Sequence, residues 1–318
     1  MTRKLNGLKI VLATPRGFCA GVERAVGTLQ KAIDSFDSPV YVKHEVVHNK
    51  FIIEDFKKKG VKFIEDINLV PDNSVLIYSA HGVSKNVKEA AKQKNLKIFD
   101  ATCPLVTKVH IEVHKHAKNG TDVILIGHNG HPEIEGTMGQ YDSETGNIHL
   151  IESEEDVQSL EIKNQDLAYV TQTTLSMDDT SKIIDCLKEK FPNIKAPAKE
   201  DICYATQNRQ DAVNSIIEYC DFLIVIGSKN SSNSKRLAEL AVKNSVPAVL
   251  IDHKDDLDIE LLSDKKIIGI TAGASAPEIL FNDVLDHLIS HGAEIKDFGQ
   301  ENKTENITFG LPKELRNL

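Results

Sequence analysis

The sequence predicts an α/β protein with three similar lobes, whose mostly parallel sheets are arranged in a pseudo-threefold manner around one central site. Short, continuous apolar runs alternate with segments of helical periodicity, which is typical of parallel strands covered on both faces. Three cysteines also share one local context, and a polar turn follows each of them at the same distance.

Nine apolar runs have the length and composition of strands. They cover residues 9–14, 39–43, 74–80, 96–101, 122–128, 167–172, 222–228, 247–252 and 267–273. Helical patterns separate them, so the connections are those of βαβ units.

Cys19, Cys103 and Cys203 each stand where an extended segment gives way to a helical one. Pro104 suits the first position of such a helix. A polar turn then lies 25 residues beyond each cysteine, at His44, His128 and Ser228. We interpret this recurrence as a threefold internal repeat.

The repeat predicts lobes at residues 21–102, 103–199 and 200–290. Residues 1–20 would supply a strand and the first cysteine, packed with the third lobe, and residues 291–318 would form a carboxyl-terminal extension. Ligands of open α/β sheets bind beyond the carboxyl ends of the strands, so three lobes presenting those ends to one axis would enclose a single site.

Composition excludes several classes of protein. The chain has 318 residues, and 38 Lys and Arg against 47 Asp and Glu give a net charge of −9, which argues against a nucleic-acid partner. No apolar run approaches the roughly 20 residues that span a bilayer, and the amino terminus lacks a signal-peptide pattern. Five cysteines without close pairs suit a reducing compartment. We therefore expect a cytoplasmic protein with no membrane contact.

Three thiols meeting at one point favour metal binding, although each cysteine alone could be a small buried side chain. Closed zinc sites take four ligands in close pairs, which are lacking. An iron-sulfur cubane held by three cysteines would leave one iron open to substrate. Cys220 continues an apolar helical stripe and Cys186 lies inside a helical segment, so both are predicted to be structural.

The polar turns lack the glycine-rich phosphate patterns of nucleotide-binding proteins. Ser231, Ser232 and Asn233 stand where a strand passes into a helix, a place that suits a phosphate group. Ordinary helix capping is the alternative interpretation, and Ser275 has the same two interpretations.

His128 and His131 have the spacing of half a metal site, but the second half is missing, so we expect them to make hydrogen bonds instead. Glu133 lies in the same strand-to-helix turn. Alone it is a carboxylate favoured by a helix dipole, whereas beside a metal and a histidine it could relay a proton.

Nine motifs in order make the chain resemble the 4-hydroxy-3-methylbut-2-enyl diphosphate reductases. They are PRGFCAGVERA, KHEVVHNK, SAHGVS, DATCPLVTKVH, GHNGHPEIEGTMGQY, TQTTLS, DICYATQNRQ, GSKNSSNSKRL and TAGASAP. The resemblance implies three lobes around a cavity and one 4Fe-4S cluster per chain, ligated by Cys19, Cys103 and Cys203.

The resemblance also implies roles for the polar residues. Substrate binding falls to His48, His81, His131, Thr173, Ser231, Ser232, Asn233 and Ser275, with Thr173 at the hydroxyl end and the others at the diphosphate. Glu133 matches the catalytic proton donor.

The implied reaction is the last step of the methylerythritol phosphate pathway. Two electrons and two protons remove an allylic hydroxyl group as water, with the open iron binding the departing oxygen, and give isopentenyl and dimethylallyl diphosphates. No flavin or nicotinamide motif is visible, so a ferredoxin or flavodoxin is the expected electron donor. Two alternatives stay open: a non-catalytic iron-sulfur redox sensor, and a thiol or zinc hydrolase that uses His128, His131 and Glu133.

Overall fold

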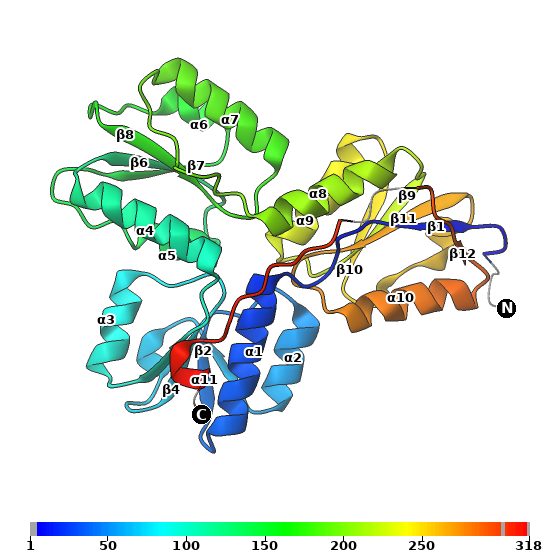
Figure 1. Cartoon of the computed structure of the whole chain (residues 1–318), viewed down its shortest axis with the longest axis horizontal. Coiled ribbons are helices and arrows are strands. Elements are labelled where there is room, and N and C mark those ends of the chain that lie inside the picture. The colour runs from blue at the N-terminus through cyan, green and yellow to red at the C-terminus, as the bar shows by residue number, and fades with distance from the viewer. Residues whose placement is uncertain (1–4, 300–302, 317–318) are drawn as a thin grey trace. The chain divides into compact units, whose positions relative to one another are not determined.

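The structure, a computed structural model, describes residues 5–299 and 303–316. It confirms the predicted α/β class, because helices alternate with strands and the paired strands are parallel. The strands form three sheets (Figure 1). The described chain divides into two compact units: residues 5–20, 48–54, 204–299 and 303–308 form unit 1, and residues 21–47, 55–203 and 309–316 form unit 2.

Unit 1 contains a sheet of order β10-β9-β11-β1-β12. Its strands are β1 (Lys9–Leu12), β9 (Phe222–Ile226), β10 (Ala248–Ile251), β11 (Ile267–Ala272) and β12 (Glu294–Ile295). Its helices are α8 (Tyr204–Ile217), α9 (Ser232–Lys243), α10 (Glu278–Ser290) and the short 3-10 turns η2 (Lys254–Asp256) and η3 (Ile259–Leu262). Strand β1 pairs with β11, so the amino-terminal strand completes a sheet made mainly from the last third of the chain.

Both faces of this sheet are buried, as its apolar runs predict. Ile224 and Ile226 pack toward α10, whereas Leu223 and Val225 pack toward α8 and α9. Side chains alternate between faces along a strand, so only a continuous apolar run can supply both sides.

Unit 2 contains two sheets, of order β3-β2-β4-β5 and β7-β6-β8. The strands are β2 (Val40–Lys43), β3 (Lys62–Ile64), β4 (Val75–Tyr78), β5 (Lys97–Asp100), β6 (Asp122–Ile126), β7 (Ile148–Ile151) and β8 (Leu167–Thr171). The helices are α1 (Ala20–Ser35), α2 (Lys50–Lys58), η1 (Ile67–Leu69), α3 (Lys85–Gln93), α4 (Pro104–Lys118), α5 (Pro132–Met138), α6 (Glu154–Ser159), α7 (Met177–Lys190) and α11 (Lys313–Arg316). Helix α1 starts with the last residue of the first segment of unit 1, and α2 begins in unit 1 and ends in unit 2.

All nine predicted strands are present. The proposed lobe boundaries stay a prediction, although the sheet count fits three lobes.

The two cysteines that we predicted to be structural lie in packed surroundings. Cys220 is buried in the turn between α8 and β9, in the core between helix and sheet, and this burial raises the pKa of its thiol to about 12. Cys186 packs from α7 against the core of the β7-β6-β8 sheet. A buried thiol with such a raised pKa stays protonated and is a poor metal ligand.

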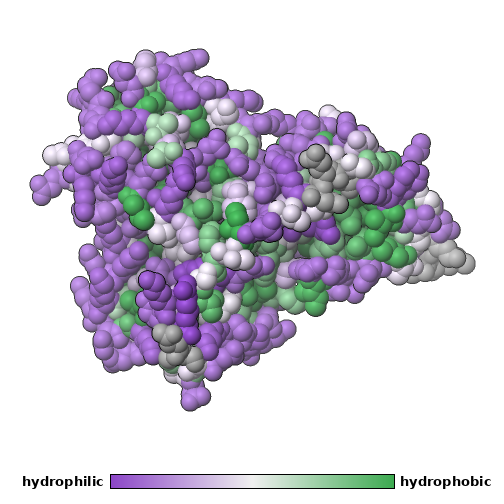
Figure 2. All heavy atoms as spheres, viewed as in Figure 1, coloured by the Kyte–Doolittle hydropathy of each residue, from purple (hydrophilic) through white to green (hydrophobic). Residues whose placement is uncertain are grey.

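Hydrophilic residues cover most of the surface visible in Figure 2, as expected for a chain with 27% charged residues. Of the helices in the described ranges, none is both long and apolar enough to cross a bilayer.

Candidate functional site

Each of the three predicted ligand cysteines directly precedes a helix: Cys19 precedes α1, Cys103 precedes α4 and Cys203 precedes α8. Their backbone N–H groups make equivalent hydrogen bonds. The acceptors are the carbonyl oxygens of Ala274, Ala80 and Thr173, at 3.2, 3.0 and 3.0 Å, and each acceptor follows a strand, β11, β4 or β8. The repeat inferred from the sequence therefore exists as one local geometry built three times.

The chemistry of these three cysteines fits an iron-sulfur cluster. None of the five cysteines, all of them described, forms a disulfide, and Cys19, Cys103 and Cys203 are each half-buried. A thiol at the amino-terminal end of a long helix is favoured as the thiolate, the form that binds iron. Within the described residues, no group of three His, Cys, Asp or Glu side chains is assembled as a metal site. Cys19 belongs to unit 1 and the other two to unit 2, so the three-cysteine site stays a prediction.

Unit 2 places Glu133 in a buried polar cluster. The side chain lies in the first turn of α5 and belongs to a residue that is only 3% exposed. Its two carboxyl oxygens accept hydrogen bonds from Thr173, one from the backbone N–H at 2.7 Å and one from the hydroxyl at 3.0 Å. Because the carbonyl oxygen of Thr173 also binds the amide of Cys203, this threonine joins the acid to the cysteine segment.

Burial raises the pKa of Glu133 to about 7, from an ordinary value of 4.5. Desolvation is the largest cause; the two hydrogen bonds from Thr173 oppose it and the charge of Asp201 adds to it. An acid with a pKa near the working pH is well suited to donate a proton.

His131 caps α5, because its Nδ1 accepts a hydrogen bond of 3.1 Å from the backbone N–H of Glu133. A ring nitrogen that accepts carries no proton, so the neutral ring holds its proton on Nε2 and can donate from there. His81 lies edge-on to this ring, with 5.6 Å between the ring centroids. His128 instead contacts Glu152 at 3.1 Å, in line with the expectation that it makes hydrogen bonds.

The remaining candidates cluster at the amino terminus of α9 in unit 1. Ser231 is the N-cap and accepts from the amide of Ser234 at 3.3 Å, so the capping interpretation is confirmed. Ser275 instead lies ahead of the α10 cap, donates to the carbonyl oxygen of His48 at 2.8 Å, and has its hydroxyl 3.4 Å from that of Ser231.

Asn233 is buried in the first turn of α9, and its Oδ1 accepts from the amide of Ala274 at 2.8 Å. Ser232 is buried beside it. Buried hydroxyl and amide groups at the start of a long helix can bind an anion.

One polar residue in this region escaped the sequence analysis. Asn49 is buried, and its Oδ1 accepts from the amide of Ile52 at the start of α2. Its Nδ2 has no hydrogen-bond partner among the described residues. A buried amide donor in that state is rare and suits a ligand acceptor. Its place directly after His48 in KHEVVHNK was the only signal in the sequence.

The fold and these polar clusters define a class: three-sheet α/β proteins with a cysteine before a helix in each repeat and a buried acid. The chain belongs to the LytB family, because the family model described as "LytB protein" matches residues 10–289.

Similar proteins and a similar solved structure support this assignment. A protein from Acinetobacter baumannii named 4-hydroxy-3-methylbut-2-enyl diphosphate reductase is 57% identical over 97% of this chain and 98% of its own. One of the same name from Pseudomonas entomophila is also 57% identical, with the same coverage. The solved structure of E-1-hydroxy-2-methyl-but-2-enyl-4-diphosphate reductase from Plasmodium falciparum matches with a TM-score of 0.89 and 42% identity, over 99% of this chain and 98% of its own.

Proposed function

We propose that this chain is a reductase that converts 4-hydroxy-3-methylbut-2-enyl diphosphate into isopentenyl and dimethylallyl diphosphates. The relatives that share its full length and carry that name support the substrate and the reaction. The observation that carries the chemistry is the buried Glu133, whose raised pKa and contacts with Thr173 suit a proton donor beside a cysteine segment.

In this proposal Cys19, Cys103 and Cys203 ligate one 4Fe-4S cluster. Their half-buried thiols and their positions before long helices support this assignment. When bound, the cluster would supply the electrons and a Lewis-acidic iron. The chain itself supplies the binding groups, their orientation and the proton.

The diphosphate is proposed to bind histidine, serine and asparagine side chains rather than a glycine-rich loop. These donors are His48, His81, His131, Ser231, Ser232, Asn233 and Ser275. The helix start at α9 and the Nε2 proton of His131 support this role, because both present N–H or O–H groups to an anion.

The hydroxyl end of the substrate is assigned to Thr173 and Glu133. Hydroxide is a poor leaving group, so the departing oxygen needs a proton, and the protonated carboxyl group of Glu133 can deliver it. Thr173 holds both carboxyl oxygens and so fixes the direction of that proton.

The electron donor is proposed to be a ferredoxin or flavodoxin, since the sequence has no motif for a second redox cofactor. The cytoplasmic location also remains a prediction. A redox sensor would need a cluster but no diphosphate site, and the names of the relatives favour the enzyme.

One preparation tests the proposal. The full chain is purified without oxygen, iron and sulfide are assayed, and turnover of the allylic diphosphate is measured with a chemical reductant. We expect a brown protein in which Cys19→Ser, Cys103→Ser and Cys203→Ser each lose most of the iron. The matched variants Cys186→Ser and Cys220→Ser should keep it. An iron-free wild type, or an intact cluster in Cys203→Ser, contradicts the assignment.

A further inference from the structure

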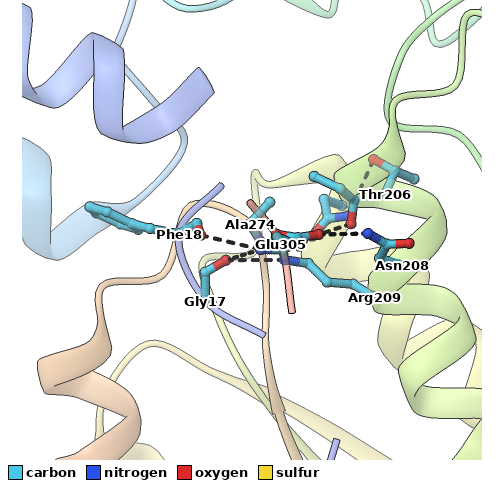
Figure 3. Close-up of polar contacts among 9 residues, drawn as sticks. Gly17, Phe18, Thr206, Asn208, Arg209, Ala274 and Glu305 are labelled. Carbon is cyan, nitrogen blue, oxygen red and sulfur yellow. Dashed lines mark hydrogen bonds and ion pairs between the residues drawn. The ribbon is translucent and has the colours of Figure 1, made fainter. Parts of the chain in front are cut away.

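A buried arginine holds the segment that precedes Cys19. Arg209 on α8 is fully buried and donates from Nε and Nη2 to the carbonyl oxygen of Gly17 at 3.0 and 2.7 Å, and from Nη2 to that of Phe18 at 3.2 Å. Figure 3 shows the guanidinium of Arg209 between these carbonyl groups and Glu305. Glu305 accepts from both Nη atoms at 3.1 and 3.3 Å, so the buried charge is paired.

A second arginine holds the segment that precedes Cys103. Arg24 on α1 donates from Nη1 to the carbonyl oxygen of Thr102 and from Nη2 to that of Asp100, both at 2.9 Å. Its Nε donates to the carbonyl oxygen of Gly310 at 2.9 Å. All three nitrogens of the guanidinium therefore bind backbone oxygens.

A lysine holds the segment that precedes Cys203. The Nζ of Lys108 on α4 donates to the carbonyl oxygens of Lys199 and Glu200 at 2.5 and 2.9 Å. It also lies 2.9 Å from Oδ1 of the buried Asp201, whose other oxygen accepts from the amide of Thr171. This cation thus ties the cysteine segment to the end of β8.

The three cations occupy corresponding places in the repeat. Arg24 lies five residues after Cys19, Lys108 five after Cys103 and Arg209 six after Cys203, each on the helix that its cysteine precedes. Each binds the segment of a different cysteine: the first helix reaches the second segment, the second helix the third, and the third helix the first. These hydrogen bonds therefore form a closed cycle, in which the helix of each repeat holds the cysteine segment of the next.

We propose that Arg24, Lys108 and Arg209 are positioning residues that hold Cys103, Cys203 and Cys19 in the geometry needed for one cluster. The role of the cysteines rests on the proposed function. The cyclic order means that removing the cation of one helix should loosen the segment of the next cysteine and not that of its own.

Three physical arguments support this role. A cation that donates to several carbonyl oxygens makes stronger hydrogen bonds than a neutral donor and fixes more than one peptide group at once. Fixed ligand segments keep thiols in place with little loss of entropy on binding. Arg24 and Arg209 also bind the carbonyl oxygen of the residue directly before Cys103 and Cys19, and a positive charge so placed favours the more negative, reduced state of a bound cluster.

Hydrogen–deuterium exchange of the full-length chain tests the cyclic order. The variants are Arg24→Gln, Lys108→Gln and Arg209→Gln. We expect the exchange of the amides around Cys103, Cys203 and Cys19, respectively, to rise about tenfold or more, as loss of a charge-assisted hydrogen bond predicts. The segment of the cysteine that precedes the substituted helix should keep wild-type exchange.

Lys190 supplies a matched control. This half-buried lysine also donates to two backbone carbonyl oxygens, those of Val157 and Gln158, but far along the chain from the three cysteines. Lys190→Gln should leave all three cysteine segments unchanged. Arg24→Lys and Lys108→Arg keep the charge, and we expect Lys108→Arg to restore most of the protection and Arg24→Lys, which has one nitrogen in place of three, to restore part of it. If Arg209→Gln does not fold, the Arg24 and Lys108 variants still decide the order.

In cluster-loaded protein, the reduction potential should fall in Arg24→Gln and Arg209→Gln, whose charges bind the residue next to a cysteine, and not in Lys190→Gln. Faster exchange at the cysteine of the same helix, equal changes in all three segments, or an unaltered potential would each overturn the proposal. An iron-free wild type would refute the proposed function instead, and the exchange pattern would still report on the positioning.

Discussion

The side chain of Glu133, in unit 2, combines burial, two hydrogen bonds and a raised pKa. Its carboxyl group is buried, bound by Thr173 through both oxygens, and has its pKa raised to about 7. Its neighbour Glu135, two residues along the same helix, has a side chain that is 59% exposed and lies 3.9 Å from Nε2 of His44. The two carboxylates of α5 are therefore a natural pair for experiments on proton transfer.

We predict that Glu133→Gln abolishes turnover while the cluster survives. Glutamine keeps the size of the side chain and one acceptor for Thr173 but cannot deliver a proton, and a positioned acid contributes roughly 10²- to 10⁴-fold to a rate. Anaerobic turnover with a chemical reductant measures the loss, and the cluster spectrum shows that the site is intact. Glu135→Gln is the control and should stay active. If Glu133→Gln keeps its turnover and Glu135→Gln loses it, Glu133 is not the proton donor.

The same carboxyl group should make stability depend on pH. Its pKa is higher in the folded chain than in the unfolded one, so between about pH 4.5 and 7 the folded state binds more protons and stability falls as pH rises. The loss is complete above pH 7 and is on the order of 3 kcal/mol at most. Glu133→Gln should remove this dependence of stability on pH.

Urea unfolding of the cluster-free chain at pH 5.5 and pH 8 checks this sign. The stability of Glu133→Gln relative to wild type should be greater at pH 8 than at pH 5.5. Glu135→Gln, at a side chain that is 59% exposed, is the surface control for this comparison. A relative stability that is equal at both pH values would place Glu133 in a more polar setting than the structure gives.

Residue identities were easier to predict from the sequence than residue environments. The recurring context of Cys19, Cys103 and Cys203 selected them as candidate ligands, which stays a prediction. The apolar stripe around Cys220 predicted a core position, which the structure confirms. The pKa of Glu133 could not be predicted, because it depends on burial and on Thr173, 40 residues away in the chain. Arg24, Lys108 and Arg209 were missed because their partners are backbone oxygens, which leave no signal in the sequence.

At the scale of elements, the start of α9 contains both a helix cap and groups that are proposed to bind diphosphate. Ser231 caps the helix and Asn233 binds the amide of Ala274, while both are proposed to bind diphosphate. Capping and anion binding use the same end of the helix because its amides and its dipole attract any acceptor. A loss of affinity on substitution must therefore be separated from a loss of helix stability.

We predict that Ser231→Ala with Asn233→Ala weakens diphosphate binding by about 1.5 to 3 kcal/mol for each hydrogen bond lost to the charged group. The cluster spectrum should not change. Calorimetry with the substrate or with inorganic diphosphate measures the effect. Ser176 is a matched control, because it caps α7 through the amide of Asp179 at the same 3.3 Å, outside the proposed site. Ser176→Ala should lose a comparable cap and no affinity; unaltered binding in the folded double variant would exclude this role for α9.

The elements that the sequence analysis missed share one property. Strands β3, β7 and β12 lie at the edges of their sheets and are short and partly exposed. A strand covered on both faces needs a continuous apolar run, whereas an edge strand does not, so its pattern is weak. The nine strands found in advance include all the central ones.

At the scale of the whole molecule, the order of helices and strands could be predicted from the sequence, and the lobe boundaries stay a prediction. The three sheets and the pairing of the amino-terminal strand β1 with β11 fit the expected repeats. The described chain forms two compact units. Two of the limits between them fall directly after Ala20, which follows Cys19, and directly after Cys203. Periodicity shows where elements begin and end, but compactness depends on packing between distant segments, which no local pattern reveals.

Because the proposed cluster would bind the folded chain and not the unfolded one, its removal should destabilise the chain. Binding to the folded state alone raises its stability by mass action, and metal affinity then becomes folding free energy. At roughly 2 °C per kcal/mol, we expect the melting temperature to fall by more than about 5 °C when iron is removed by chelation. Scanning calorimetry of loaded and cluster-free protein measures it. Cys186→Ser should show the same fall in melting temperature, whereas Cys203→Ser should melt near the cluster-free value even before chelation. Identical melting of loaded and cluster-free wild type would argue that the cluster does not stabilise the folded chain.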